Sequence, residues 1–104
     1  MEELFMDIKI HSIHFDADKK LVDFINSKVK KLIQFYDNII GIEVFLRLEK
    51  DQNTENKVAE IRLDIPGNDV FAKKKTKSFE ESVDNCIEAI KRQITKFKEK
   101  QRGV

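Results

Sequence analysis

Apolar residues recur at every second position in three stretches of the chain, which is the pattern of a strand with one buried face. These stretches are residues 6–13, 42–48 and 59–65. A turn is predicted at 66–69, where Pro fixes φ and Gly supplies a positive φ. A fourth, short strand at 70–73 follows that turn. The alternation therefore predicts four strands.

Two other stretches have apolar residues at helical spacing. The first begins near Leu21, after Asp16 or Asp18 as N-cap, and ends at about 36–38. The second runs from Phe79 to about Lys100, with Ser78 and Glu81 placed to form a capping box. The stripe expected to be buried on the first helix is Leu21, Ile25, Val29, Leu32 and Tyr36. The stripe expected on the last helix is Phe79, Val83, Cys86, Ile87, Ile90, Ile94 and Phe97.

The predicted element order is β-α-β-β-β-α, and the last three strands are joined by short loops into an antiparallel meander. Both helices carry apolar stripes that need a partner, so both must cover the same face of the sheet. The fold class is therefore α+β: a two-layer sandwich of a four-stranded, mostly antiparallel sheet and two helices on one face.

Composition limits the remaining choices. The chain has 104 residues and a mass of 12.2 kDa, which is enough for one domain. We interpret residues 1–5 as an extension, with Met6 as the alternative start, and 6–102 as the single domain. One Cys excludes an internal disulfide framework and a multi-Cys zinc site. No membrane span or secretory signal is evident, so the expected location is the cytoplasm.

An enzyme is not expected. His11 and His14 are the two histidines, and neither has metal-ligand spacing to a second ligand. Cys86 lies on an apolar helix face, which favours a core thiol over a nucleophile. No Gly-rich phosphate loop is present, so we expect no catalytic residue, metal, cofactor or small-molecule substrate.

Charge is placed unevenly. Residues 73–104 hold 10 Lys/Arg and 5 Asp/Glu, whereas residues 1–72 hold 10 and 14. A basic third within a nearly neutral chain indicates a polyanionic partner, although lysine-rich helices can also simply be soluble.

Two basic stripes flank the apolar face of the last helix. One consists of Arg92, Lys96 and Lys100, the other of Lys91, Lys98 and Arg102. An outermost ridge of Glu81, Glu88 and Glu99 separates them. Such stripes could bind phosphates on both sides of the helix. Alternatively, their stems cover the rim of the core while the charges stay in water.

A lysine cluster is predicted just before the last helix. Lys73, Lys74, Lys75 and Lys77 fall in the expected connection from the fourth strand. There they repel one another and meet the positive end of the helix dipole. This conflict indicates an anion-binding surface; solvated loop lysines are the alternative.

Several segments resemble those of a known family, the ribosome hibernation promoting factors, also called ribosome-associated translation inhibitors. The first helix "LVDFINSKVKKL" and the ending "FYDNI" resemble the family's opening half. The segment "SFEESVDNCIEAIKRQITKFKEK" resembles its signature last helix, with Val83-Asp84, Arg92-Gln93 and spaced lysines. The resemblance covers residues 6–102 and implies a fold similar to a double-stranded-RNA-binding domain. It is closest to the short form, which lacks a C-terminal domain that pairs ribosomes.

The resemblance implies a stress and stationary-phase silencer of translation. Its partner would be the small ribosomal subunit, with 16S-type rRNA and ribosomal proteins, bound between head and body. There it would occlude the positions of mRNA and of A- and P-site tRNA. The rRNA-binding residues implied by the resemblance are Lys28, Lys31, Arg92, Lys96, Lys98 and Lys100. We add Lys91 and Lys73, Lys74 and Lys75 on electrostatic grounds alone.

Two alternatives remain from the sequence. One is a generic module that binds structured RNA away from the ribosome. The other is a protein-interaction domain that uses the outer sheet face, where Phe45 and Phe71 are expected, unless residues 1–5 cover them. Salt distinguishes the two, because RNA binding weakens as salt rises and an apolar interface does not.

Overall fold

The computed structural model describes residues 7–13, 15–36, 38–50 and 54–103, excluding the side chains of residues 7 and 100–103. The element order is the predicted one. The elements are β1 (Asp7–Ile13), α1 (Lys19–Phe35), β2 (Gly41–Leu48), β3 (Lys57–Ile65), β4 (Asn68–Thr76) and α2 (Phe79–Gly103).

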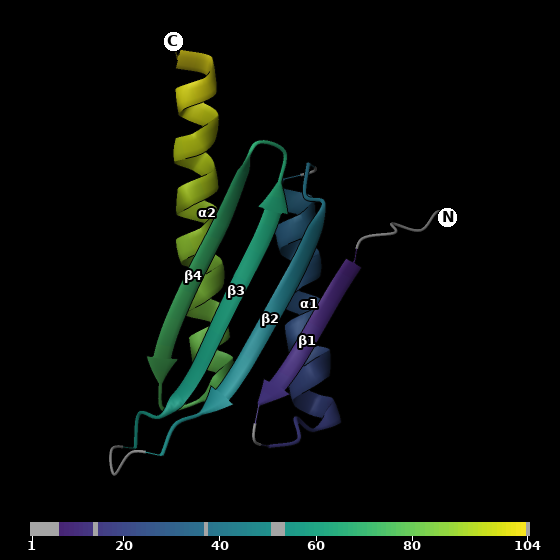
Figure 1. The fold of residues 1–104 in the computed structure, drawn as a ribbon, viewed down its shortest axis with the longest axis vertical. Helices are drawn as coiled ribbons and strands as arrows, with labels where there is room; N and C mark the ends of the chain where they lie inside the picture. The colour runs from purple at the N-terminus through teal and green to yellow at the C-terminus, as the bar shows by residue number, and fades with distance from the viewer. Residues whose placement is uncertain (1–6, 14, 37, 51–53, 104) are drawn as a thin grey trace.

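The four strands form one sheet in the order β1-β2-β3-β4. The pairs β2–β3 and β3–β4 are antiparallel, which confirms the predicted meander. β1 lies at the edge and pairs with β2 in parallel, with Ile10 opposite Val44. A parallel pair needs a crossover connection, and α1 provides it. Figure 1 shows both helices behind the sheet, so its other face, called the outer face below, is not covered by either helix.

The core lies between the sheet and the two helices. Alternate strand residues such as Val44, Leu46 and Ile61 face the helices and are inaccessible to solvent. The stripe predicted on α1 is buried throughout. On α2 the predicted stripe is also buried, except that Phe79 and Phe97 at its two ends are only partly covered. One continuous apolar layer therefore fixes both helices on the sheet.

Each helix begins at a hydroxyl or carboxylate cap. Asp18, not Asp16, caps α1, because its Oδ1 accepts from the backbone N–H of Leu21 at 2.9 Å. Ser78 Oγ accepts from the N–H of Glu81 at 3.1 Å, as predicted for α2. The N–H of Ser78 donates instead to Thr76 Oγ1, so the reciprocal half of the capping box is replaced by a contact with β4.

The fourth strand is longer than predicted. β4 covers Asn68–Thr76, and the β3–β4 turn contains only Pro66 and Gly67, whose φ is +78°. The expectation of a four-residue turn and a strand at 70–73 was wrong. Lysines interrupt the apolar pattern there, but an edge strand tolerates them because its backbone pairs on one side only. Consequently Lys74 and Lys75 lie within the strand, in register with Ala59 and Val58.

The packing of α2 gives a stability prediction. Ile90 has no exposed surface, so Ile90→Ala removes a fully buried side chain and leaves a cavity. We expect the free energy of unfolding to fall by about 2–4 kcal/mol, measured by urea denaturation. Glu88→Ala, an exposed position on the same helix, is the control and should change it by less than about 0.5 kcal/mol. Equal effects of the two changes would show that Ile90 is not in the core.

Candidate nucleic-acid interface

Basic side chains line the junction between α1 and α2 on the side away from the sheet. Lys28 of α1 reaches α2, where its Nζ lies 3.1 Å from Asp84 Oδ1. The same ammonium lies 5.4 Å from the centre of the Phe24 ring. Lys31 follows three residues later on the same flank of α1 and is exposed.

Phe35 organises the basic residues of α2 at this junction. The ammonium groups of Lys91 and Lys98 lie 5.6 and 5.5 Å from the centre of its ring. Lys98 also lies 5.6 Å from the ring of Tyr36. Cation–π attraction to this ring, which is 39% exposed, favours positions of both ammonium groups close to it at the surface. The residues Lys28, Lys31, Lys91 and Lys98 are called the interhelical group.

A second basic group lies on the opposite flank of α2, beside β4. Arg92 and Lys96 are exposed there. Between them, Gln93 Nε2 donates to the backbone carbonyl of Phe71 at 2.8 Å, which ties this flank to the edge strand. Lys74, half-buried, lies on the helix side of β4 because Val70 and Ala72 of the same strand face the core. Lys74, Arg92 and Lys96 are called the edge group.

The predicted lysine cluster at the start of α2 does not exist as one cluster. Because successive strand residues point to opposite faces, Lys74 is on the helix side while Lys73 and Lys75 are on the outer face. Lys75 Nζ lies 3.2 Å from Glu49 Oε1 of the β2–β3 connection. Only Lys77 lies in the connection itself. The side chain of Lys100 lies outside the described residues.

The two basic groups flank an acidic ridge, as the helical spacing predicts. Glu81, Glu88 and Glu99 are all exposed along the outermost line of α2. The positive charge of α2 therefore lies on its flanks and the negative charge along its crest.

Cys86 is a core thiol. It has no exposed surface, and its Sγ–H donates to the carbonyl of Ala59 at 3.3 Å. Burial raises the pKa of the thiol from 9.0 to about 11, so it stays protonated at neutral pH. Among the residues with described positions, no group of three or more His, Cys, Asp or Glu could hold a metal ion. His14 lies outside the described residues.

The outer face carries a row of planar side chains that sequence reasoning identified only in part. Phe45 and Phe71 lie on it, as predicted. His11 stacks on Phe45 with ring centroids 4.7 Å apart and an interplanar angle of 14°. Arg62 lies between the two phenylalanines, 5.4 Å from Phe45 and 5.9 Å from Phe71. The alternation of β3 could have placed Arg62 there, but its alignment with both rings depends on strand register.

Within the described residues, neither helix is both long and apolar enough to cross a membrane. The fold is a small α+β domain with two helices on one face of a four-stranded sheet. Residues 8–102 match the family described as Sigma 54 modulation protein / S30EA ribosomal protein. The match covers nearly the whole chain, and the chain belongs to this family.

Curated relatives agree with this assignment. The chain is 27% identical over 99 residues to the ribosome hibernation promoting factor of Pseudomonas putida, covering 95% of this chain and 93% of the relative. It is also 27% identical over 95 residues to that of Escherichia coli K12, covering 91% and 96%. The resemblance stated from the sequence motifs is confirmed.

Solved structures confirm the fold. A ribosomal subunit interface protein from Coxiella burnetii superposes with a TM-score of 0.79 at 19% identity, over 89% of this chain and 98% of that one. The Protein Y N-terminal domain of Thermus thermophilus gives 0.74 at 22% identity, over 88% and 99%. Both comparisons bear on the fold alone.

The buried thiol gives a pH prediction. Because the pKa of Cys86 is about 11 in the folded chain against 9.0 ordinarily, the unfolded chain loses this proton first. The thiol's contribution to stability is therefore complete below pH 9 and is lost as pH rises towards 11. Urea denaturation across this range should show a steeper fall in the free energy of unfolding for the parent than for Cys86→Ala. Parallel profiles would contradict this account of the thiol.

Proposed function

We propose that this chain inhibits translation by binding the small ribosomal subunit between head and body, over the positions of mRNA and of A- and P-site tRNA. The proposal draws on the family assignment and on relatives named ribosome hibernation promoting factor. The protein would act in the cytoplasm by occupying space, so it needs no catalytic group.

The observation that carries the proposal is the pair of basic groups that flank α2. The interhelical group includes Lys91 and Lys98, both held over Phe35, and the edge group includes Arg92 and Lys96. Lysine and arginine on both flanks of one helix can neutralise phosphates of two RNA segments, or of one that folds around the helix. Folded rRNA is bound mainly through such backbone and shape contacts.

An acidic side chain beside the interhelical group reduces the positive charge of that group. Asp84 lies 3.1 Å from Lys28 and partly neutralises it. Both side chains are substantially exposed, so this pair is screened by solvent and Lys28 can exchange Asp84 for a phosphate at little cost. Among the predicted residues, Lys73 and Lys75 lie on the other side of the sheet. Their contact with rRNA would require a second RNA-facing surface.

Co-sedimentation with bacterial ribosomes tests the proposal. Purified protein should pellet with the small subunit, compete with bound mRNA and tRNA, and dissociate steeply as salt rises from low to moderate. Arg92→Glu/Lys96→Glu should abolish pelleting while leaving the fold intact, because both side chains are exposed. Lys91→Glu/Lys98→Glu, which reverses two charges of the interhelical group, is expected to do the same.

The matched control is Lys30→Glu/Lys50→Glu, which makes the same change in net charge at exposed positions outside both groups. It should pellet like the parent. If Arg92→Glu/Lys96→Glu also pellets like the parent, the edge group does not contact RNA. Equal binding of the parent to free tRNA and total RNA would instead favour a generic RNA-binding module, and no binding at either salt would exclude both.

A further inference from the structure

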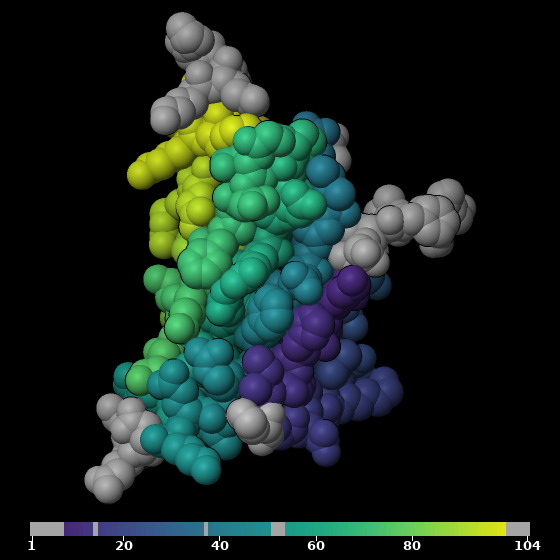
Figure 2. Space-filling view, in the orientation of Figure 1, coloured from purple at the N-terminus to yellow at the C-terminus, as the bar shows by residue number. Residues whose placement is uncertain are grey.

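The row of planar groups on the outer face crosses all four strands. His11 of β1 is in register with Phe45 of β2, and Arg62 of β3 is in register with Phe71 of β4. The contacts His11–Phe45, Phe45–Arg62 and Arg62–Phe71 link them into one series, called the stacking row below. Figure 2 views this face of the sheet, on the opposite side from both helices. Phe71, at the end of the row, is 47% exposed.

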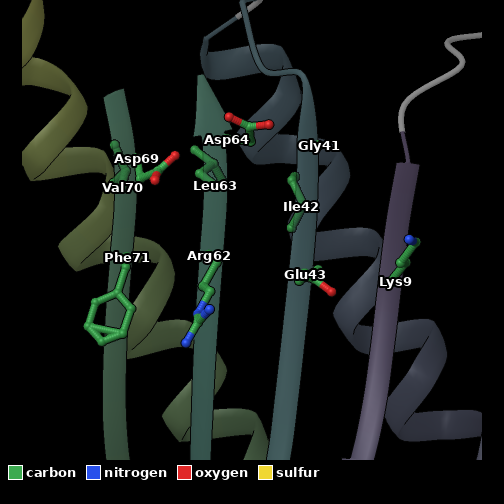
Figure 3. A pocket seen from close by; sticks show the side chains of 10 residues that line it. All are labelled: Lys9, Gly41, Ile42, Glu43, Arg62, Leu63, Asp64, Asp69, Val70 and Phe71. Atoms are coloured by element: carbon green, nitrogen blue, oxygen red, sulfur yellow. The ribbon is translucent and has the colours of Figure 1, made fainter. Parts of the chain in front are cut away.

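A depression of about 560 Å³ adjoins the exposed end of this row. Figure 3 shows the side chains of Phe71 and Arg62 along it, with Lys9 and Glu43 towards β1. Leu63 and its neighbours Ile42 and Val70 point towards the helices, so only their backbone lines the floor of the depression. The exposed ring of Phe71 beside the planar guanidinium of Arg62 suits a flat ring.

Two carboxylates at one end of the depression decide which part of a nucleotide could enter. Asp64 and Asp69 face each other across β3 and β4 and are exposed. Within the described part of the chain, neither side chain forms a hydrogen bond or an ion pair. They repel a phosphate, whereas an uncharged base carrying N–H donors can approach them. The charges of this end therefore favour a base over a phosphate.

We propose that the outer face binds unpaired RNA bases, which stack on Phe71 and continue the series formed by Arg62 and Phe45. Aromatic rings and arginine on a four-stranded sheet are suited to stacking bases that are not already paired. The inference rests on the proposed function, since it assigns the sheet face as a second contact with RNA. Lys73 lies on the same face, where it could contact the phosphates of an RNA strand whose bases stack there.

An apolar protein partner fits this surface less well. Docking such a partner would bury Arg62, whose Nε is paired with Glu60 at 3.1 Å, and would remove both charges from water. A base stacks on the guanidinium plane and leaves its edges hydrated.

The test exploits the absence of tryptophan from the sequence. Phe71→Trp keeps an aromatic ring at the exposed position and makes it the sole tryptophan, whose emission falls when a base stacks on it. Phe71→Leu keeps an apolar side chain but removes the ring. Leu48→Ala, a change at another exposed apolar side chain near the end of β2, is the matched control. Circular dichroism would verify that each variant folds.

The probe is a short single-stranded oligoadenylate, compared with an abasic oligomer of the same length. We expect the parent, Phe71→Trp and Leu48→Ala to bind oligoadenylate alike, and Phe71→Leu to bind at least about 5-fold more weakly, the factor that corresponds to about 1 kcal/mol. Oligoadenylate should quench the tryptophan and the abasic oligomer should not. Equal binding by Phe71→Leu and the parent, or an unquenched tryptophan, would overturn the inference.

Ribosome pelleting separates this inference from the proposed function. If the parent pellets with the small subunit but oligoadenylate does not quench Phe71→Trp, the stacking surface is excluded and the proposed function stands. If oligoadenylate quenches the tryptophan but the parent does not pellet, the proposed function fails and the stacking surface stands. If Phe71→Leu binds ribosomes as the parent does while Phe71→Ala does not, the face is an apolar protein contact and the inference is overturned.

Discussion

The structure depends on the one-sided burial of the sheet. Each strand gives alternate apolar residues to a single face, and the stripes of α1 and α2 are covered only when both helices pack on that face. Because β1 and β2 are parallel, the chain must cross over between them, and α1 is the crossover that also covers the sheet. Every surface property described above follows from this division into a helix side and an outer face.

On the helix side, packing determines which charges meet. Burying Ile90 and Ile94 against the sheet turns one flank of α2 towards α1 and the other towards β4. Lys91 and Lys98 then reach the Phe35 ring of α1, while Gln93 joins the opposite flank to β4. The lysines and arginine thus lie on two surfaces separated by an acidic ridge. This geometry places positive charge along both flanks of α2 and negative charge between them.

On the outer face, charged side chains lie among the rings of His11, Phe45 and Phe71, and strand register aligns them across the sheet. The face is neither a plain apolar patch nor a basic surface, since Glu43 and Glu60 lie among the cations and contact His11 and Arg62. This surface therefore combines charged side chains with the exposed Phe71 ring. Under the proposals above, the helix side would bind through salt-sensitive phosphate contacts and the outer face through stacking.

The sequence by itself determined the element order, the buried stripes, the Ser78 cap and the core position of Cys86, because periodicity and capping are local properties of the chain. It also contained the segments that identify the family. It did not determine the length of β4, since pairing with β3 overrides the polarity of Lys73, Lys74 and Lys75 and sends them to both faces of the sheet. Only the tertiary structure decided that Lys91 and Lys98 lie over Phe35, or that Arg62 lies between Phe45 and Phe71. These contacts join residues distant in sequence, and helix packing and strand register alone bring them together.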